Sequence, residues 1–201
     1  MAEDSTQPPH ATRYVETTRG ILSYAQLAPL LAERVLRVLQ DIEEAHYADR
    51  PLDESLLLDL HRGICGDLTP SWAGRFRDAE VLVGPHQPPP PHRVPQLVRD
   101  YFADLNTRLQ TLGGEDDPLL LELLSFAEGR LLSIHPFTDF NGRVTRLFLA
   151  ELIRRLELPD VELAPLEHAD RSRYLQALRA GDGLNWQPLI ELWQARLSAS
   201  P

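Results

Sequence analysis

The sequence contains no lysine, and all 20 of its basic residues are arginine. A chain without Lys cannot carry a Walker-A phosphate-binding loop, a Schiff-base nucleophile or the Lys of a protein-kinase site. Any recognition of phosphate groups must therefore use Arg side chains, backbone N–H groups or a metal ion.

Cysteine and long apolar runs are also scarce. The single Cys65 excludes internal disulfides and multi-cysteine zinc sites. No apolar run approaches the roughly 18 residues of a membrane span, and the start of the chain lacks the pattern of a secretory signal. The formal net charge of −10 has the wrong sign for general affinity to nucleic acid or anionic lipid. These features predict a soluble, cytoplasmic protein with no nucleic-acid and no membrane partner.

The length of 201 residues and the hydrophobic fraction of 43% suit one sizeable domain. Residues 1–20 are polar and predict a flexible or regulatory N-terminal segment, loosely ordered up to about Arg19. Residues 21–201 are expected to form a single helical domain.

Apolar residues recur at helical spacing along most of that domain. The helix expected from residue 119 has apolar residues on almost every face, which is typical of the centre of a bundle. Asp53 is a predicted N-cap, and Asp117-Pro118 is a helix-start signal. Helices are expected over residues 24–46, 53–64, 94–112, 119–132, 141–156, 169–180 and 186–197.

Residues 66–92 differ from the rest because Gly and Pro interrupt them repeatedly. Only residues 79–83 read as a short strand. The predicted fold class is therefore all-α, with one small hairpin or flap that includes Val81, Leu82 and Val83.

The chemistry is concentrated between two of the predicted helices. His135 follows the most buried helix, and Asp139 lies four residues further on. Asn141-Gly142 then opens the next helix, whose free N–H groups make an anion site. Arg143 and Arg146 follow within the first turns. A base, a carboxylate, an anion site and two guanidinium groups together suit phosphoryl or nucleotidyl transfer.

This segment resembles the signature of Fic-domain proteins, His-Pro-Phe-x-Asp/Glu-Gly-Asn-Gly/Lys-Arg-x-x-Arg. Every fixed position matches except Phe140, where the family usually has Gly. Weaker similarities at residues 60–62, 73–77 and 174 extend the resemblance over about residues 50–195. The resemblance implies a Fic-like helical bundle with a short β-hairpin flap.

The family resemblance implies a protein adenylyltransferase that moves AMP from ATP to a Ser, Thr or Tyr hydroxyl of a target protein. His135 matches the base that takes the hydroxyl proton, and Asp139 matches the ligand of Mg²⁺. Asn141 and Gly142 match the loop that holds phosphate oxygens. Arg143 and Arg146 match the residues that grip the β- and γ-phosphates. Gly142 favours AMP transfer, because the Doc-type kinases of the family carry Lys there.

Phe140 is the main departure from the family pattern, and it belongs to the predicted nucleotide-binding residues. If the position requires a left-handed backbone, Phe costs about 1–2 kcal/mol there. Its ring is expected to narrow or reshape the nucleotide pocket. Two alternatives therefore stay open: transfer of another group, such as UMP or phosphocholine, and a non-catalytic domain that binds a nucleotide or a protein.

The resemblance also concerns regulation and target binding. Residues 12–16 have the Thr-x-x-x-Glu spacing of the family's inhibitory helix, but Thr17 follows instead of Gly or Asn, so Glu16 is a candidate inhibitory residue. Val81, Leu82 and Val83 match the flap that pairs with the target backbone as an added strand. A bacterial enzyme is expected, with self-modification or a small antitoxin partner as further expectations.

Overall fold

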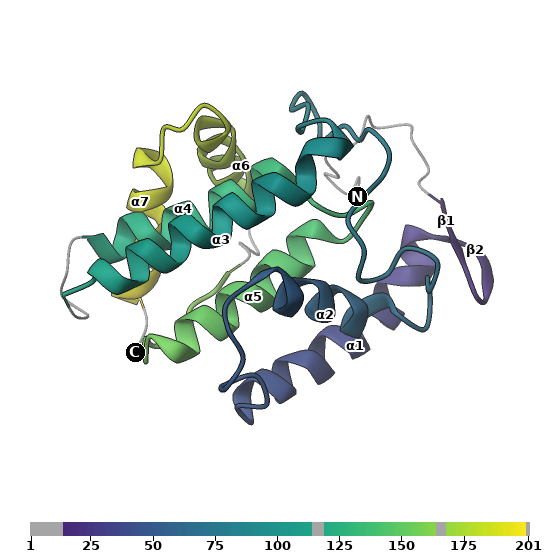
Figure 1. Cartoon of the computed structure of the whole chain (residues 1–201). Coiled ribbons are helices and arrows are strands. Elements are labelled where there is room, and N and C mark those ends of the chain that lie inside the picture. The colour runs from purple at the N-terminus through teal and green to yellow at the C-terminus, as the bar shows by residue number, and fades with distance from the viewer. Residues whose placement is uncertain (1–13, 114–118, 164–167, 200–201) are drawn as a thin grey trace.

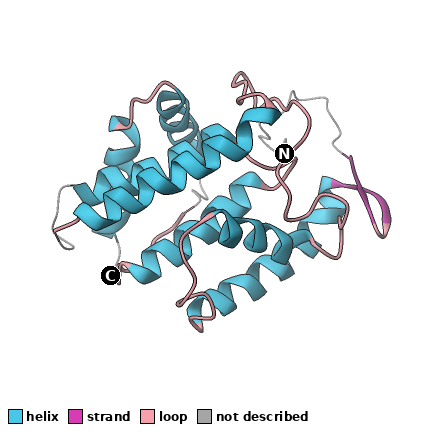
Figure 2. Cartoon of the chain, in the orientation of Figure 1, coloured by secondary structure: helices cyan, strands magenta, loops and turns pink. Residues whose placement is uncertain are grey.

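The computed structural model describes residues 14–113, 119–163 and 168–199. In these ranges the chain forms seven α-helices, one short 3-10 helix and one two-stranded sheet (Figures 1 and 2). This confirms the predicted all-α class, although the small sheet lies at residues 14–23 and not at the predicted flap. The helices are α1 Tyr24–Glu43, α2 Glu54–Cys65, η1 Pro91–Arg93, α3 Val94–Thr111, α4 Leu119–Ile134, α5 Asn141–Arg155, α6 His168–Asp182 and α7 Gln187–Ala199.

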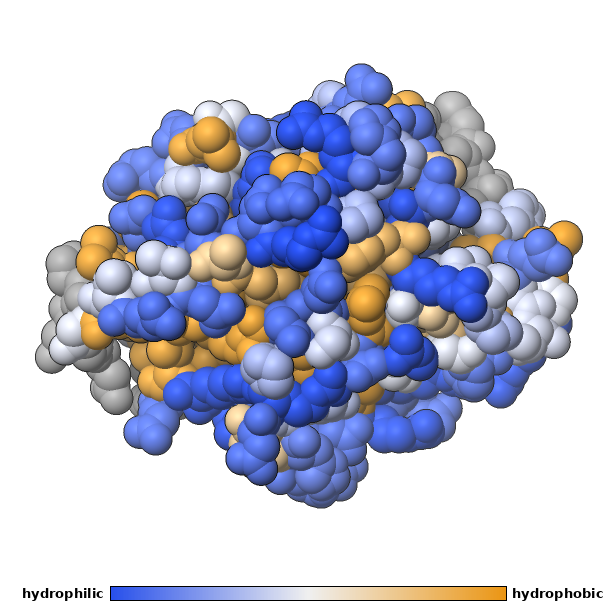
Figure 3. All heavy atoms as spheres, in the orientation of Figure 1, coloured by the Kyte–Doolittle hydropathy of each residue, from blue (hydrophilic) through white to orange (hydrophobic). Residues whose placement is uncertain are grey.

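Helix α4 lies at the centre of the bundle, as its all-round apolar sequence predicted. It contacts α3, α5, α6 and α7, while α5 contacts α1 and α2 on its other side (Figure 1). On the face in Figure 3, hydrophilic residues cover the outer helices and apolar residues gather along the middle of the molecule. No helix in the described ranges is long and apolar enough to cross a membrane.

Glycine allows a close contact between α4 and the start of α7. A Cβ on Gly129 of α4 would lie 2.5 Å from Trp186 Cζ3 and 2.7 Å from Leu189 Cδ1, both closer than atoms can approach. The missing side chain therefore lets the start of α7 pack directly on α4. This contact holds α6 and α7 beside α4, the helix that ends just before His135.

Local capping signals in the sequence agree with the helix starts. The Asp53 side chain accepts a hydrogen bond from Leu56 N at 3.1 Å and so caps α2, as predicted. Ser23 and Gln26 form a reciprocal capping box at the start of α1. The predicted start signal at residues 117–118 lies outside the described residues.

An antiparallel hairpin, β1 Tyr14–Thr17 and β2 Gly20–Ser23, precedes α1. The prediction of loose order was therefore wrong for residues 14–19, and residues 1–13 lie outside the described ranges. Gly20 has φ 95°, which favours glycine and closes the turn. Val15 is buried against the core, so tertiary packing adds to the strand propensity of Tyr14, Val15, Thr17 and Ile21.

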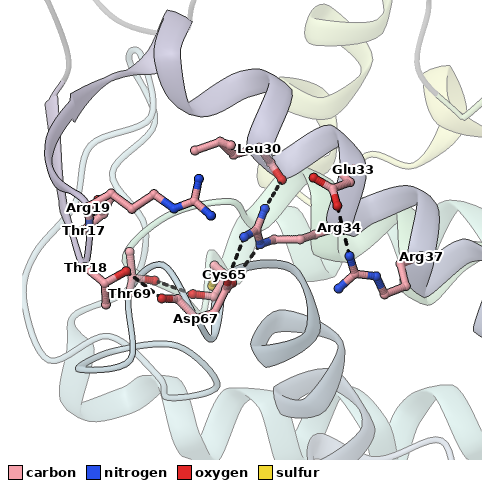
Figure 4. A network of polar contacts seen from close by, with 10 residues as sticks. All are labelled: Thr17, Thr18, Arg19, Leu30, Glu33, Arg34, Arg37, Cys65, Asp67 and Thr69. Atoms are coloured by element: carbon pink, nitrogen blue, oxygen red, sulfur yellow. Dashed lines mark hydrogen bonds and ion pairs between the residues drawn. The ribbon is translucent and has the colours of Figure 1, made fainter.

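The hairpin is fastened to the segment that follows α2 (Figure 4). Thr18 N donates to Leu68 O at 2.8 Å, and Thr18 Oγ1 donates to Asp67 O at 2.8 Å. The buried Arg34 of α1 donates through Nε to Asp67 Oδ1 at 2.8 Å. The hairpin, α1 and the end of α2 thus meet around Asp67.

Residues 79–83 do not form the predicted strand. The segment contains a single bridge, in which Val83 and His86 exchange two backbone hydrogen bonds of 3.0 Å. The residues have strand propensity, but the described chain offers them no neighbouring strand, and Gly84-Pro85 turns the backbone at once. The small sheet of this fold is therefore the N-terminal hairpin, and the predicted flap is a loop.

Candidate functional site at the start of helix α5

The loop of residues 135–140 joins the central helix α4 to α5. His135 and Phe140, at its two ends, both have left-handed backbones, with φ 51° and 61°. His135 N donates to Leu131 O at 3.1 Å, so the residue completes the last turn of α4. The His135 side chain is half-buried, which leaves the predicted base at the surface of the loop.

The condition that the sequence analysis attached to Phe140 is met, because its backbone is left-handed, with φ 61° and ψ 14°. Its ring is only 3% exposed. The ring centroid lies 5.5 Å from that of Trp72 and 6.3 Å from that of Tyr24. The ring therefore packs into the core instead of projecting from the loop, and a nucleotide contact by Phe140 stays a prediction.

Asn141 closes the loop from inside. Its Oδ1 accepts from Phe137 N at 2.8 Å, and its Nδ2 donates to Phe137 O at 2.8 Å. The side chain is buried, so this pair of bonds is protected from water. Asn141 thereby fixes the turn; a contact of its amide with phosphate stays a prediction.

Asp139 is held in one orientation by two donors. Its Oδ1 accepts from Phe140 N at 2.7 Å and from the phenol of Tyr24, the first residue of α1. The residue is 8% exposed. The described residues contain no group of three or more His, Cys, Asp or Glu that could hold a metal ion. Asp139 could therefore bind Mg²⁺ only together with phosphate oxygens and water, which is the way Mg²⁺ commonly binds.

His61 of α2 packs against the loop of residues 135–140, a contact that the sequence did not predict. Its ring stacks on Phe137 with centroids 3.9 Å apart and an interplanar angle of 8°. Gly74 N donates to His61 Nδ1 at 2.8 Å, so Nε2 carries the proton and faces Asp139 O at 3.3 Å. Burial lowers the pKa of His61 from 6.5 to about 4. A neutral His61 thus links α2 to the loop.

The first turn of α5 carries the predicted anion site. The N–H groups of Asn141 and Gly142 have no preceding helical carbonyl to bind. A Cβ on Gly142 would lie 3.5 Å from Arg146 Nη1, so this guanidinium folds back over the first turn. Among the described residues, neither Arg143 nor Arg146 has a carboxylate within ion-pair distance. The helix start therefore offers two N–H groups and two uncompensated cations to an anion.

Arg146 sits in front of a buried polar cluster. Glu128 of α4 accepts from Tyr174 Oη at 2.7 Å and from Arg196 Nη1 at 2.8 Å. Burial lowers the pKa of Arg146, while the negative charge of Glu128 acts in the opposite direction. The ion pair of Glu128 is made with Arg196, so among the described residues Arg146 has no carboxylate within ion-pair distance.

The remaining predicted residues lie elsewhere on the molecule. Glu16 is exposed on β1 opposite Ile21 and makes no ion pair with any described residue, so its inhibitory role stays a prediction. Thr12 of the same pattern lies outside the described residues. Leu82 is 76% exposed, and Val81 and Val83 are half-buried beside it. Target binding by these three residues also stays a prediction.

The fold is thus a helical bundle with a histidine at the end of its central helix and free N–H groups at the next helix start, a candidate site for an anion. A comparison with family models identifies its class: residues 51–153 match the Fic/DOC family. The chain therefore belongs to the Fic/DOC family.

Individual relatives agree with this assignment. The protein adenylyltransferase fic-1 of Caenorhabditis elegans is 35% identical over 134 residues, which cover 67% of this chain and 25% of that protein. The protein adenylyltransferase Fic of Aedes aegypti is 32% identical over 126 residues, covering 63% of this chain and 24% of that protein. The chain thus spans about a quarter of the length of these curated relatives.

The fold is also that of a solved structure. The BepC protein, a VirB-translocated effector of Bartonella tribocorum with bound AMPPNP, superposes with a TM-score of 0.72. The alignment covers 93% of both chains at 17% identity. At this identity the likeness concerns the fold alone.

Proposed function

We propose that this protein is a protein adenylyltransferase, which transfers AMP from ATP to a Ser, Thr or Tyr hydroxyl of a target protein. The observation that carries the proposal is the junction of α4 and α5. There the half-buried His135 lies six residues before a helix start without a side-chain cap, over which Arg146 is folded with no ion pair to any described residue. Relatives with the name protein adenylyltransferase support the same activity.

The reaction would proceed by in-line displacement at the α-phosphorus of ATP. The target hydroxyl oxygen forms a bond to the α-phosphorus, and the bond from that phosphorus to the bridging oxygen of the β-phosphate breaks. His135 takes the hydroxyl proton as the attack proceeds. Pyrophosphate leaves with the bridging oxygen and its electron pair.

The N–H groups at the start of α5, with Arg143 and Arg146, would hold the β- and γ-phosphates in line with the attacking oxygen. Mg²⁺, when bound, neutralises phosphate charge and so assists departure of pyrophosphate. Asp139 would hold that ion, because Tyr24 and Phe140 N fix its carboxylate beside the loop. ATP and Mg²⁺ are therefore the proposed donor and cofactor.

Intact-mass spectrometry after incubation with Mg-ATP tests the proposal without knowledge of the target, if the protein modifies itself. Wild type should gain the mass of one AMP moiety, and His135→Ala should gain nothing. A gain confined to Glu16→Gly would assign the inhibitory role to Glu16. A gain from UTP or a phosphocholine donor, but not from ATP, would overturn the choice of AMP.

A protein partner follows from the proposed reaction, because the hydroxyl acceptor is a protein side chain. A separate antitoxin, a cytoplasmic location and a bacterial source stay predictions. Co-purification of the His135→Ala variant with its bound target from cells would identify the protein that carries the acceptor hydroxyl.

A further inference from the structure

Arg77 carries a buried positive charge that forms no ion pair with any described carboxylate. The residue lies between α2 and η1 and is 3% exposed. Burial lowers the pKa of its guanidinium, and the charge of Glu80 opposes this effect only weakly. A desolvated cation is unfavourable unless surrounding groups compensate it. The hydrogen-bond partners that compensate it here are main-chain carbonyl groups.

Those carbonyl groups belong to two separate parts of the chain. Arg77 Nε donates to His135 O at 2.8 Å, and Nη2 lies 3.5 Å from Ile134 O, the last residue of α4. On the other side, Nη1 donates to Ala79 O at 3.1 Å and Nη2 donates to Pro89 O. The negative end of the α4 dipole favours a cation at this place.

Ala79 and Pro89 are the two ends of the loop that contains the exposed Leu82. One guanidinium therefore closes the base of this loop and joins it to the backbone of His135. The backbone N–H of Arg77 adds a bond to Pro136 O at 2.9 Å. Within residues 79–89 the only other backbone pairing in the described chain is the bridge of Val83 with His86.

His86 holds the tip of the same loop against the bundle. Its Nε2 lies 3.0 Å from Ser133 O, in the last turn of α4, and its Nδ1 lies 3.1 Å from Asp182 Oδ2 of α6. The loop of residues 79–89 is thus attached to the C-terminal end of α4 at both its base and its tip.

We propose that Arg77 is a positioning residue, which holds the loop of residues 79–89 at a fixed position relative to the backbone of His135. This inference rests on the proposed function, in which a target hydroxyl must come within about 3 Å of the His135 imidazole. Arg77 would thus set the position of a target chain docked on the exposed loop relative to His135. A misplacement of about 1 Å can lower a rate about 100-fold, so the position of this loop decides the rate of transfer.

Two substitutions and one matched control test the inference. Arg77→Gln removes the charge and the fork of donors, and Arg77→Lys keeps the charge but cannot reach carbonyls on both sides. The control is Arg155→Gln. Arg155 also donates to main-chain carbonyls of a loop, Arg50 O at 2.8 Å and Tyr47 O at 2.7 Å, but at the opposite end of α5.

Hydrogen–deuterium exchange provides a readout that does not depend on catalysis. The amides of Val83, His86 and Phe137 are hydrogen-bonded and report on the loop and on the catalytic turn. Both Arg77 variants should accelerate exchange in residues 79–89 and 134–140 together. Arg155→Gln, which also removes the bond from Arg155 Nε to Glu151 Oε1 at 2.6 Å, should accelerate exchange near residues 45–52 and at the end of α5, and leave residues 79–89 and 134–140 unchanged. Unchanged exchange in either of the two linked segments, or a uniform rise along the chain, would overturn the inference.

The second readout separates positioning from loss of fold. In both Arg77 variants the rate of AMP transfer at saturating Mg-ATP should fall about 100-fold, while the affinity for AMPPNP stays that of wild type. Arg155→Gln should keep the wild-type rate. Equal losses in Arg77→Gln and Arg155→Gln would make Arg77 merely structural. If wild type transfers no group at all, the proposed function fails, and the exchange experiment still decides the positioning role.

Discussion

At Phe140 two effects of a single residue oppose each other. The left-handed backbone, with φ 61°, disfavours any side chain by about 1–2 kcal/mol. Burial of the ring against Tyr24 and Trp72 favours Phe, because loss of a buried Phe side chain costs about 3–5 kcal/mol. Packing outweighs the backbone strain, which explains how the chain keeps Phe where its family usually has Gly.

Substitution at this position separates the two effects. Phe140→Gly and Phe140→Ala should both destabilise the protein, by about 2–4 kcal/mol, because both remove the ring. The Gly variant should be the more stable of the two by about 1 kcal/mol, since only Gly relieves the left-handed strain. Urea unfolding of the three proteins measures this order. An Ala variant more stable than the Gly variant would show that the strain is absent.

The motif usually has Gly at position 140, so the sequence raised a left-handed backbone there as a condition, and the structure meets that condition. It did not reach the contacts of the loop with Tyr24, His61 or Arg77. These partners lie 115, 78 and 58 residues from the atoms that they contact. No local pattern encodes such contacts, because they form only when α1, α2 and the segment after α2 fold against the loop.

At the scale of elements, His61 joins α2 to the loop of residues 135–140, and this contact depends on pH. Burial keeps His61 neutral, with a pKa of about 4 in place of 6.5. Below pH 6.5 the His61 side chain therefore binds a proton in the unfolded chain but not in the folded chain. Stability is complete above pH 6.5 and declines as the pH falls toward 4, by about 3 kcal/mol in total.

Comparison of wild type with His61→Gln isolates this effect, because other groups titrate alike in both proteins. The stability advantage of wild type at pH 7 should shrink between pH 6.5 and pH 4.5. Chemical unfolding at a series of pH values, without added metal, measures it. A difference that stays constant over this range would mean that His61 is not held neutral in the folded protein.

The hairpin shows why one element escaped prediction while others did not. The range expected for α3 was 94–112 and the observed range is Val94–Thr111, because its apolar spacing and flanking breakers are local signals. The hairpin, in contrast, is stabilised by Thr18 binding to Asp67, 49 residues away. The strand expected at 79–83 had the local propensity but has no partner strand in the described part of the chain.

At the scale of the whole molecule, the apolar surface of α4 predicted its central position but not the order of helices around it. That order brings Glu128 to Tyr174 and Arg196, and among the described residues it leaves Arg146 without an ion-pair partner. A half-buried cation without such a partner does not stabilise the unliganded fold. If Arg146 binds a phosphate group, as proposed above, the same cation stabilises the liganded fold. The proposed function thus predicts opposite contributions of Arg146 to the two states.

Replacement of Arg146 should separate these two contributions. Arg146→Gln should leave the stability of the unliganded protein within about 1 kcal/mol of wild type or above it, because an uncompensated charge is removed. Mg-AMPPNP at 100 times its Kd should stabilise wild type by about 2.7 kcal/mol. That is a rise of roughly 5–10 °C in Tm for a chain of this size. The Arg146→Gln variant should lose this rise, whereas Arg155→Gln, at the other end of α5, should keep it. Thermal unfolding with and without the nucleotide measures all three proteins.

A nucleotide-dependent rise in Tm that survives in Arg146→Gln would exclude Arg146 from the proposed phosphate site. The remaining donors would then be the N–H groups of Asn141 and Gly142, with Arg143.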